Sequence, residues 1–208
     1  STAFDLSTVS YDSVSFSVAG QDATPRDIAF NTGGSKMYMV GNSNDSVHQY
    51  SLSTAFDLST ASYDSVSFSV AGQDTIPVGI AFNTNGTKMY MVGAANDSVY
   101  QYSLSTAYDL STASYDSVSF SVAGQDTQPY GMAFSTDGSK MYMVGVSNDS
   151  VYEYSTATPA TITYNSALKW PSGTAPTSPA IGETDVITFN TTDGGTTYKS
   201  ALAIDGAK

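Results

Sequence analysis

The sequence contains no cysteine, and only seven of its 208 residues are lysine or arginine. Without cysteine there is no disulfide framework, no thiolate nucleophile and no cysteine-based zinc site. Cysteine usage therefore does not indicate whether the protein works in an oxidising or a reducing compartment. Seven cations cannot supply the basic face that a nucleic-acid backbone requires, which excludes nucleic acid as a partner. No apolar run approaches the roughly 18 residues of a membrane span, so insertion into a membrane is not expected.

The residues that are present favour a folded, acidic β protein. Hydrophobic residues make up 40 % of the chain, with fifteen tyrosines and nine phenylalanines, and the net charge is −12. This is enough apolar and aromatic mass to bury a core, so the chain is not a disordered acidic tail.

A repeat of 52 residues dominates the sequence. The motif STAFDLST begins at Ser1 and Ser53, and STAYDLST begins at Ser105. The segment SYDSVSFSVAGQD is identical in all three copies, at 10–22, 62–74 and 114–126. We therefore divide the chain into repeats at 1–52, 53–104 and 105–156, which together form one domain at 1–156, and a separate C-terminal module at 157–208.

Each repeat is expected to contain four strands and no helix. In the second copy these strands are predicted at 78–83, 88–93, 98–104 and 115–122, separated by turns such as Asn85-Gly86. Asn-Gly supplies the positive φ of tight hairpins, and the alternation of apolar and polar residues from Ser98 to Leu104 has the period of a half-buried strand. Four antiparallel strands in about 40–50 residues match the size of one β-propeller blade.

The repeat also resembles YVTN-type propeller repeats. The resemblance lies in the sequence from Pro77 to Thr106, PVGIAFNTNGTKMYMVGAANDSVYQYSLST, and it recurs three times over 25–156. It implies an all-β protein made of propeller blades. The chain opens with a lone fourth strand at 11–18 and its third repeat ends after a third strand, near Tyr154, so its two ends are phased for closure of a ring.

Three blades fall short of the usual minimum of about four. Upstream blades of a longer product would complete the ring, or two or three chains would share one ring by lending their fourth strands to each other. A three-fold β-trefoil or β-prism is the alternative fold. Some form of closure is expected because the open edges of three blades would invite aggregation.

The differences between the copies point to a candidate binding surface. Two stretches diverge, namely the connection from the fourth strand to the next first strand, and the connection from the second strand to the third. Both emerge on the same face of a propeller blade, and binding residues often lie on loops of a rigid scaffold. Neutral drift after a recent duplication is the competing explanation. We name this surface the variable face, and its candidate ligand-binding residues are Thr24, Arg26, Ile76, Val78, Gln128 and Tyr130.

No catalytic residue, metal site or cofactor is predicted. The recurring Asp22, Asp74 and Asp126 are single carboxylates without the density of a calcium loop, and we expect them to cap turns. The Asn-Asp-Ser sequons, such as the one at Asn96, are expected to serve turn chemistry more than glycosylation. His48 replaces a strand tyrosine and is interpreted as a surface or packing variant, not as a catalytic base. The recurring Met-Tyr pairs of the second strands are expected to pack between blades.

The C-terminal module at 157–208 is predicted to contain strands at 161–164, 167–170, 185–189 and 196–203. Its segments WPSGTAP (170–176), GETDVITF (182–189) and TDGGTTY (192–198) resemble the C-terminal ends of tailed-phage tail and virion proteins. This resemblance implies a protein of the virion surface that assembles with other copies of itself or with virion proteins.

These observations together predict a non-enzymatic phage structural protein, a tail-fibre or decoration subunit whose propeller binds a host-surface glycan or protein. A secreted bacterial adhesion or lectin-like module is the alternative. A glycan-cleaving enzyme is a lesser one. The expected location is the virion surface or the extracellular space.

Overall fold

The computed structural model describes residues 6–156, 168–169, 184–191 and 198–207. Their strands form two four-stranded sheets and two three-stranded sheets. The chain divides into two compact units, Ser1–Phe134 with Tyr142–Glu153, and Ser135–Met141 with Tyr154–Lys208. The predicted boundary between residues 156 and 157 stays a prediction.

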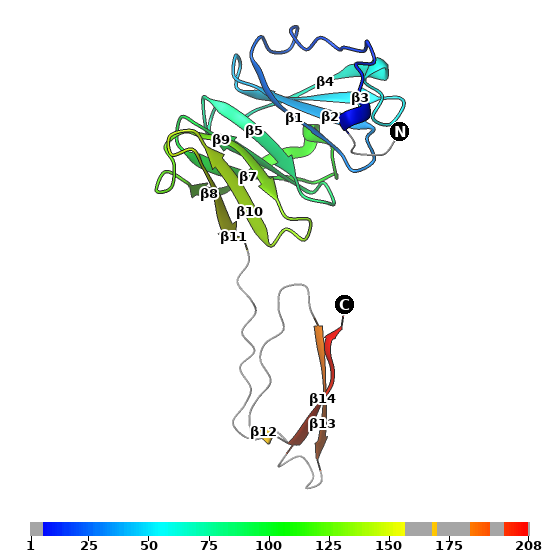
Figure 1. Ribbon diagram of the computed structural model, residues 1–208, viewed down its shortest axis with the longest axis vertical. Coiled ribbons are helices and arrows are strands. Elements are labelled where there is room, and N and C mark those ends of the chain that lie inside the picture. Colours follow the sequence, from blue (N-terminus) through cyan, green and yellow to red (C-terminus); the bar gives the residue numbers. More distant parts are fainter. Residues whose placement is uncertain (1–5, 157–167, 170–183, 192–197, 208) are drawn as a thin grey trace. The chain divides into compact units, whose positions relative to one another are not determined.

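Each of the three repeats supplies the first three strands of one sheet, and the fourth strand of the first two sheets comes from the repeat that follows, so every sheet is built from consecutive strands in sequence order (Figure 1). We call these sheets blades 1, 2 and 3. Blade 1 consists of β1 (Pro25–Phe30), β2 (Lys36–Gly41), β3 (Ser46–Leu52) and β4 (Ala61–Ser69); blade 2 of β5 (Pro77–Phe82), β6 (Lys88–Gly93), β7 (Ser98–Leu104) and β8 (Ala113–Ser121); blade 3 of β9 (Pro129–Phe134), β10 (Lys140–Gly145) and β11 (Ser150–Ser155). The predicted all-β, blade-like architecture is confirmed, the ring is not closed, and a trefoil or prism is not what the repeats form.

The turns follow from residue types that tolerate a left-handed backbone. Gly34, Gly86 and Gly138 have φ of 69°, 71° and 72° in the turn between the first and second strands. In the turn between the second and third strands this conformation falls on an aspartate, with φ of 49° at Asp45 and 46° at Asp97. Short polar side chains make this region accessible to aspartate, so Asn-Asp suffices for a tight hairpin.

Aromatic and methionine side chains fill the space between blades, as predicted. The ring of Tyr38 in blade 1 lies 4.4 Å from that of Phe82 in blade 2, and Tyr90 repeats this contact with Phe134 at 4.5 Å. The main cluster of buried side chains combines residues of blades 1 and 2, among them Met89 and Tyr102, which are fully buried. Each blade therefore depends on its neighbour to exclude water from one face of its sheet.

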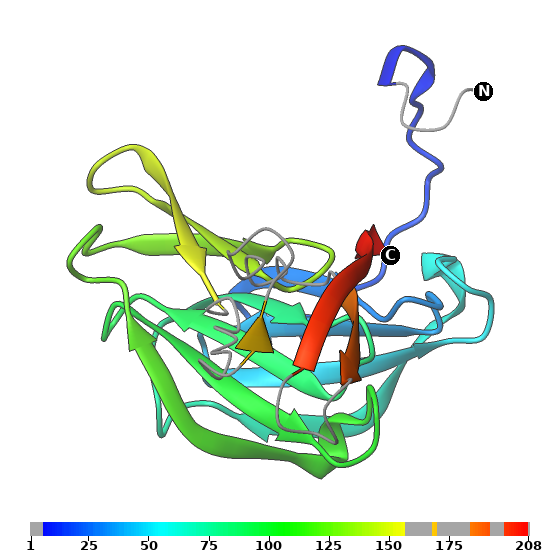
Figure 2. The same cartoon turned by 90° about the horizontal axis from the view of Figure 1, so that it is seen from below.

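The fourth strands contain a bulge that the sequence reading missed. In blade 1, Gln49 pairs with Val66 and the next residue, Tyr50, pairs with Tyr63. Two residues of β4, Asp64 and Ser65, therefore have no paired residue in β3. One of them, Ser65, has φ of 59°. The same shift recurs in blade 2, and both long strands, β4 and β8, bend along their length (Figure 2). A bulge lengthens one strand and bends it, which explains why β8 begins two residues earlier than predicted.

Short 3-10 turns precede the fourth strands and were also not predicted. They are η1 (Leu6–Thr8), η2 (Leu58–Thr60) and η3 (Leu110–Thr112). The Asp57 side chain caps η2 by accepting a hydrogen bond from the Ser59 N–H at 3.0 Å. Within the described ranges, no helix is long and apolar enough to cross a membrane.

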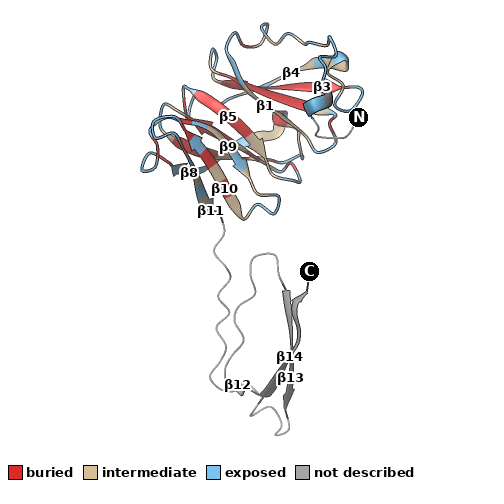
Figure 3. Cartoon of the chain, in the orientation of Figure 1, coloured by how far each residue is buried: buried red, intermediate tan, exposed pale blue. Residues whose placement is uncertain are grey.

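The predicted lone fourth strand at 11–18 needs a correction. This segment is extended but is not assigned to any sheet in the described chain. It nevertheless packs against blade 1, where Phe16 and Val18 cover a cluster of four buried side chains: Met37, Met39, Tyr50 and Leu52. Burial in blade 1 is thereby as complete as in blade 2 (Figure 3).

The C-terminal part contains one small sheet. It orders β12 (Leu168–Lys169), β14 (Tyr198–Ala207) and β13 (Thr184–Thr191), with β13 antiparallel and β12 parallel to β14. These strands overlap three of the four predicted ones. The strand predicted at 161–164, the loop at 171–179 and the turn at 192–195 lie outside the described residues.

Candidate functional site

One buried aspartate per blade ties together the two connections that form the variable face. In blade 2, Asp74 accepts hydrogen bonds from the backbone N–H of Ile76 at 2.8 Å, Ala95 at 3.1 Å and Asn96 at 2.9 Å. Ile76 precedes the first strand, whereas Ala95 and Asn96 lie between the second and third strands. The two divergent stretches therefore lie side by side, and the predicted role of this aspartate in capping turns is confirmed.

Asp22 and Asp126 repeat this arrangement in blades 1 and 3. The carboxylate of Asp22 accepts from the N–H groups of Thr24, Ser43 and Asn44. Burial alone would raise the pKa of Asp22, but the hydrogen bonds outweigh burial and hold its pKa below the usual value. An ionised carboxylate with several N–H donors is a rigid anchor, so the connections stand on a fixed base.

A glycine makes room for each anchor. A Cβ added to Gly93 would lie 2.2 Å from the Cγ of Asp74, and the equivalent glycines Gly41 and Gly145 stand in the same relation to Asp22 and Asp126. Any side chain at these positions would expel the carboxylate. This is why the second strand ends in glycine in every repeat.

Five of the six candidate ligand-binding residues are exposed. Tyr130 is 57 % exposed and Ile76 is 40 % exposed, while Thr24, Arg26 and Gln128 are also at the surface. Val78 is buried, so its side chain is not presented to a ligand. The Thr24 hydroxyl is already engaged, since it lies 2.7 Å from the Asn42 Oδ1 and 2.9 Å from the Ser43 Oγ.

Arg26, Val78 and Tyr130 occupy equivalent positions in the first strands β1, β5 and β9. Those strands are neighbours, because the Asp27 carboxylate of β1 accepts a hydrogen bond from the Ile80 N–H of β5 at 3.0 Å, and Gly79 of β5 lies near the Cα of Gly131 in β9. A cation and an aromatic ring, residue types that dominate recognition surfaces, thus stand on the same edge of the structure.

The Asn-Asp-Ser sequons are turn elements. The Asn44 Nδ2 donates to the Gln21 carbonyl at 2.7 Å, and Asn96 and Asn148 repeat this bond with Gln73 and Gln125. The amide nitrogen that a glycan would modify is therefore committed to holding two connections together. This agrees with the predicted turn chemistry.

His48 is buried in β3, which confirms a packing position. Its Nε2 lies 3.4 Å from the Asn44 Oδ1, its ring packs 6.0 Å from that of Tyr63, and its Nδ1 is buried without a hydrogen-bond partner in the structure. Burial lowers the pKa of His48 below its usual value. An imidazole enclosed in this way is poorly placed to contact a substrate.

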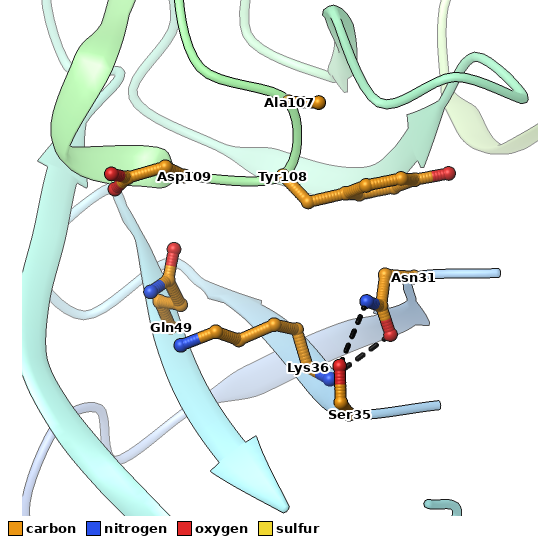
Figure 4. A pocket seen from close by; sticks show the side chains of 7 residues that line it. All are labelled: Asn31, Ser35, Lys36, Gln49, Ala107, Tyr108 and Asp109. Atoms are coloured by element: carbon orange, nitrogen blue, oxygen red, sulfur yellow. Dashed lines mark hydrogen bonds between the residues drawn. The ribbon is translucent and has the colours of Figure 1, made fainter. Parts of the chain in front are cut away.

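A polar pocket of about 370 Å³ lies between blades 1 and 2, on residues that the sequence reading did not single out (Figure 4). It lies between the first turn of blade 1 and the connection that precedes β8. Its lining residues are Asn31, Ser35, Lys36, Gln49, Ala107, Tyr108 and Asp109.

The charged groups around this pocket already serve the scaffold. The Lys36 Nζ lies 2.6 Å from the Asp64 Oδ2, and Gln49 donates to the same oxygen at 2.8 Å while accepting from the Leu110 N–H. The ion pair recurs in blade 2 as Lys88–Asp116 at 2.7 Å. Repetition in each blade indicates an architectural network, and only its recurrence in the repeats would have revealed it from sequence.

Other site types receive no support in the described ranges. No group of three or more histidine, aspartate or glutamate side chains converges there in a manner that would hold a metal ion.

No family model and no curated protein matches the sequence. Solved structures are similar in fold. A candidate 6-phosphogluconolactonase from Bacteroides uniformis aligns with a TM-score of 0.50 at 14 % identity, over 64 % of this chain and 38 % of that one. The periplasmic gluconolactonase of Pseudomonas aeruginosa gives a TM-score of 0.47 at 15 % identity over 63 % and 35 % of the two chains. The β-propeller domain of Swd1 from Myceliophteria thermophila gives 0.43 at 9 % over 62 % and 39 %.

This chain spans less than two fifths of the length of each of these structures. At such low identity the similarity shows a β-propeller-like fold and carries no information about activity. It is consistent with the three blades and their unclosed ring.

Proposed function

We propose that this protein is a non-catalytic binding module, in which propeller blades present the variable face to a glycan or protein on a cell surface. The observation that carries the proposal is the contrast between scaffold and loops. The anchors Asp22, Asp74 and Asp126 are the same in every blade and buried, whereas the side chains that they hold outward differ from blade to blade. Exposed Arg26 and Tyr130 are of the types that recognition surfaces favour.

The setting that we propose is the surface of a tailed-phage virion, where the protein is a tail-fibre or decoration subunit that contacts the host. Support for this setting comes from the resemblance of segments 170–176, 182–189 and 192–198 to virion-protein ends. Shallow recognition by a few loop residues is weak per copy and becomes useful when several copies act together.

Binding of the assembled protein to a glycan array and to host cells tests recognition. Arg26→Ala and Tyr130→Ala are each expected to lower binding by about tenfold, because truncation of a central contact costs more than about 1 kcal/mol. Thr32→Ala, in the exposed turn between β1 and β2, is the matched control and should bind as the parent does. Equal binding by all three variants would show that the variable face is not the binding surface.

Two further measurements separate the alternatives. Detection of the protein in purified virions by peptide mass spectrometry supports the phage setting, and its absence there favours a secreted adhesion module. Release of reducing ends from polysaccharide, or lactone hydrolysis, by the purified protein would overturn the non-catalytic assignment.

A further inference from the structure

The N-terminal segment at 9–18 shares a feature of the fourth blade strands but belongs to none of the sheets among the described residues. Ser13 has φ of 58°, which matches 59° at Ser65 in β4 and 59° at Ser117 in β8. A left-handed serine is uncommon and is found here at the bulge of each fourth strand. The segment therefore already carries the bulge of a strand that is paired on one side.

Its packing on blade 1 repeats the packing between blades. The Phe16 ring meets the Tyr50 ring edge-on at 5.6 Å and 83°, and Phe68 of β4 meets Tyr102 of β7 at 5.5 Å and 81°. The turn that follows is also the same, since Asp22 and Asp74 each donate their N–H to the valine four residues earlier, Val18 or Val70, at 3.0 Å. Segment 9–18 thus occupies the place of the fourth strand of a blade that precedes blade 1.

Blade 3 presents the complementary edge. The described strands of this sheet run β11-β10-β9, so β11 is its last strand, where blades 1 and 2 continue into β4 and β8. Val151 of β11 is 70 % exposed, whereas the equivalent Val47 and Val99 are 0 % and 6 % exposed. Those two valines are paired with Phe68 and Phe120 of their fourth strands.

The pairing in blades 1 and 2 fixes the register of the missing contact. Ser46 pairs with Ser69 and Val47 with Phe68. The equivalent of each fourth-strand residue in the N-terminal segment lies one 52-residue repeat earlier, and the equivalent of each β3 residue in β11 lies two repeats later. Ser150 is therefore expected to pair with Ser17, and Val151 with Phe16. The same renumbering brings Asp12 beside Lys140, where the two side chains would form the counterpart of the Lys36–Asp64 and Lys88–Asp116 ion pairs.

We propose that segment 9–17 of one copy adds antiparallel to β11 of a second copy, and that the reciprocal contact closes a ring of two chains. From Ser10 to Ser17 the segment is identical to the strands already seen to pair with β3 and β7, and it differs from them only at Val9, where they have alanine; this argues for a second copy as the occupant. Two copies of three blades give six, within the usual range of about four to eight; three copies would give nine. In a ring of two chains this contact occurs twice, related by a two-fold axis, so the whole interface is isologous.

Because the chain has no cysteine, two introduced thiols report this contact directly. Ser17→Cys and Ser150→Cys are made in separate chains, which are then mixed at a concentration that permits exchange and oxidised. Directly opposed residues of an antiparallel pair lie within reach of a disulfide. We expect a covalent dimer in the mixture and none from either chain alone. Ser46→Cys with Ser69→Cys in one chain is the positive control and should give an intrachain disulfide.

A register control uses Ser17→Cys mixed with Val151→Cys. Adjacent residues of a strand point to opposite faces, so this pair should not link. The native mass of the unmodified protein is expected to be twice the 21.8 kDa of one chain. A monomeric mass with no linked dimer, alongside a positive intrachain control, would overturn the proposal, as would a trimer or linkage in the shifted register.

One residue at this junction distinguishes the contact between copies from contacts inside a chain. Gln49 and Gln101 each donate to the aspartate of the adjoining fourth strand at 2.8 Å, and blade 3 has Glu153 at this position. Closure brings this carboxylate opposite Asp12. Glu153→Gln should therefore lower the dissociation constant of the dimer by about tenfold. The matched Gln101→Glu in blade 2 should leave this constant unchanged. Unchanged dissociation in Glu153→Gln would contradict the register. This outcome is independent of whether the variable face binds a glycan.

Discussion

The ring of Tyr108 lies directly against the backbone of Gly86: a Cβ added to this glycine would be 2.3 Å from the Cδ2 of the ring. Gly86 also has φ of 71°, so two separate constraints act on one residue. Gly138 in blade 3 has φ of 72°, and among the described residues nothing lies within 4 Å of its added Cβ.

This pair of glycines separates backbone strain from steric exclusion. Gly138→Ala is expected to lower the free energy of unfolding by about 1–2 kcal/mol through the left-handed conformation alone. Gly86→Ala should cost about 1–3 kcal/mol more, because the ring must also move. Denaturant unfolding of both variants measures the difference. Adding Tyr108→Ala to Gly86→Ala should abolish the extra cost, and equal losses in the two single variants would contradict a steric role for the ring.

The buried anchors of the variable face give a second prediction. Asp74→Ala leaves three backbone N–H groups without their acceptor, and we expect a loss of about 3 kcal/mol or more in unfolding free energy. Amide hydrogen exchange should accelerate at Ile76, Ala95 and Asn96. The half-buried cap Asp57→Ala is the control and should cost about 1 kcal/mol. Unaltered exchange at the three amides would mean that the connections hold their shape without the carboxylate.

His48 predicts a dependence on pH near neutrality. Burial lowers the pKa of His48 in the folded state, so the unfolded chain takes up the proton first as the pH falls. The associated stability is present above the unfolded pKa of about 6.5 and is lost as the pH falls through the lower folded pKa. His48→Tyr, which restores the residue of the other two repeats, should remove this dependence. Unfolding midpoints at pH 8 and pH 5 for both proteins test it.

The Lys–Asp pairs predict a separate loss of stability in acid. Burial alone would raise the pKa of Asp116, but hydrogen bonds from Lys88, Ser103 and Gln101 outweigh it and lower the pKa to about 2. The stability is therefore complete above the unfolded pKa of about 3.8 and is lost as the pH falls towards 2. Since the Lys88 side chain is 34 % exposed, screening limits the effect to about 1 kcal/mol. Asp116→Asn should flatten the unfolding curve between pH 4 and 2, and an unchanged slope would count against the pair.

The sequence predicted the first three strands of each blade closely, because proline marks the start of the first strand, glycine marks the end of the second and Asn-Asp precedes the third. The second copy, predicted at 78–83, 88–93 and 98–104, is found at Pro77–Phe82, Lys88–Gly93 and Ser98–Leu104. The bulge was missed because serine gives no local signal for a left-handed backbone. The burial of Val78 was missed because it depends on neighbouring blades, which no single repeat encodes.

The candidate surface was predicted only in part, because its contacts join residues that are distant in the sequence. Divergence between copies identified both connections of the variable face, yet it could not reveal that one carboxylate joins them, since this carboxylate is distant in sequence from Ala95 and Asn96. The polar network of Lys36, Asp64 and Gln49 was overlooked because its members come from three different strands and lie far apart in the sequence. Whether the exposed residues bind a ligand remains a prediction.

The identical segments at 10–22, 62–74 and 114–126 have a consequence for how the chain reaches its native state. Each can add to any of β3, β7 and β11 with side-chain partners that differ only at His48 and Glu153, so the strands themselves distinguish correct threading from a swap of one repeat only weakly. Only the short tether between a third strand and its own fourth strand, eight residues from Leu52 to Ala61, favours the local partner through its lower entropic cost of closure. Loosening that tether should yield mis-threaded isomers that are compact, long-lived and nearly isoenergetic with the native fold.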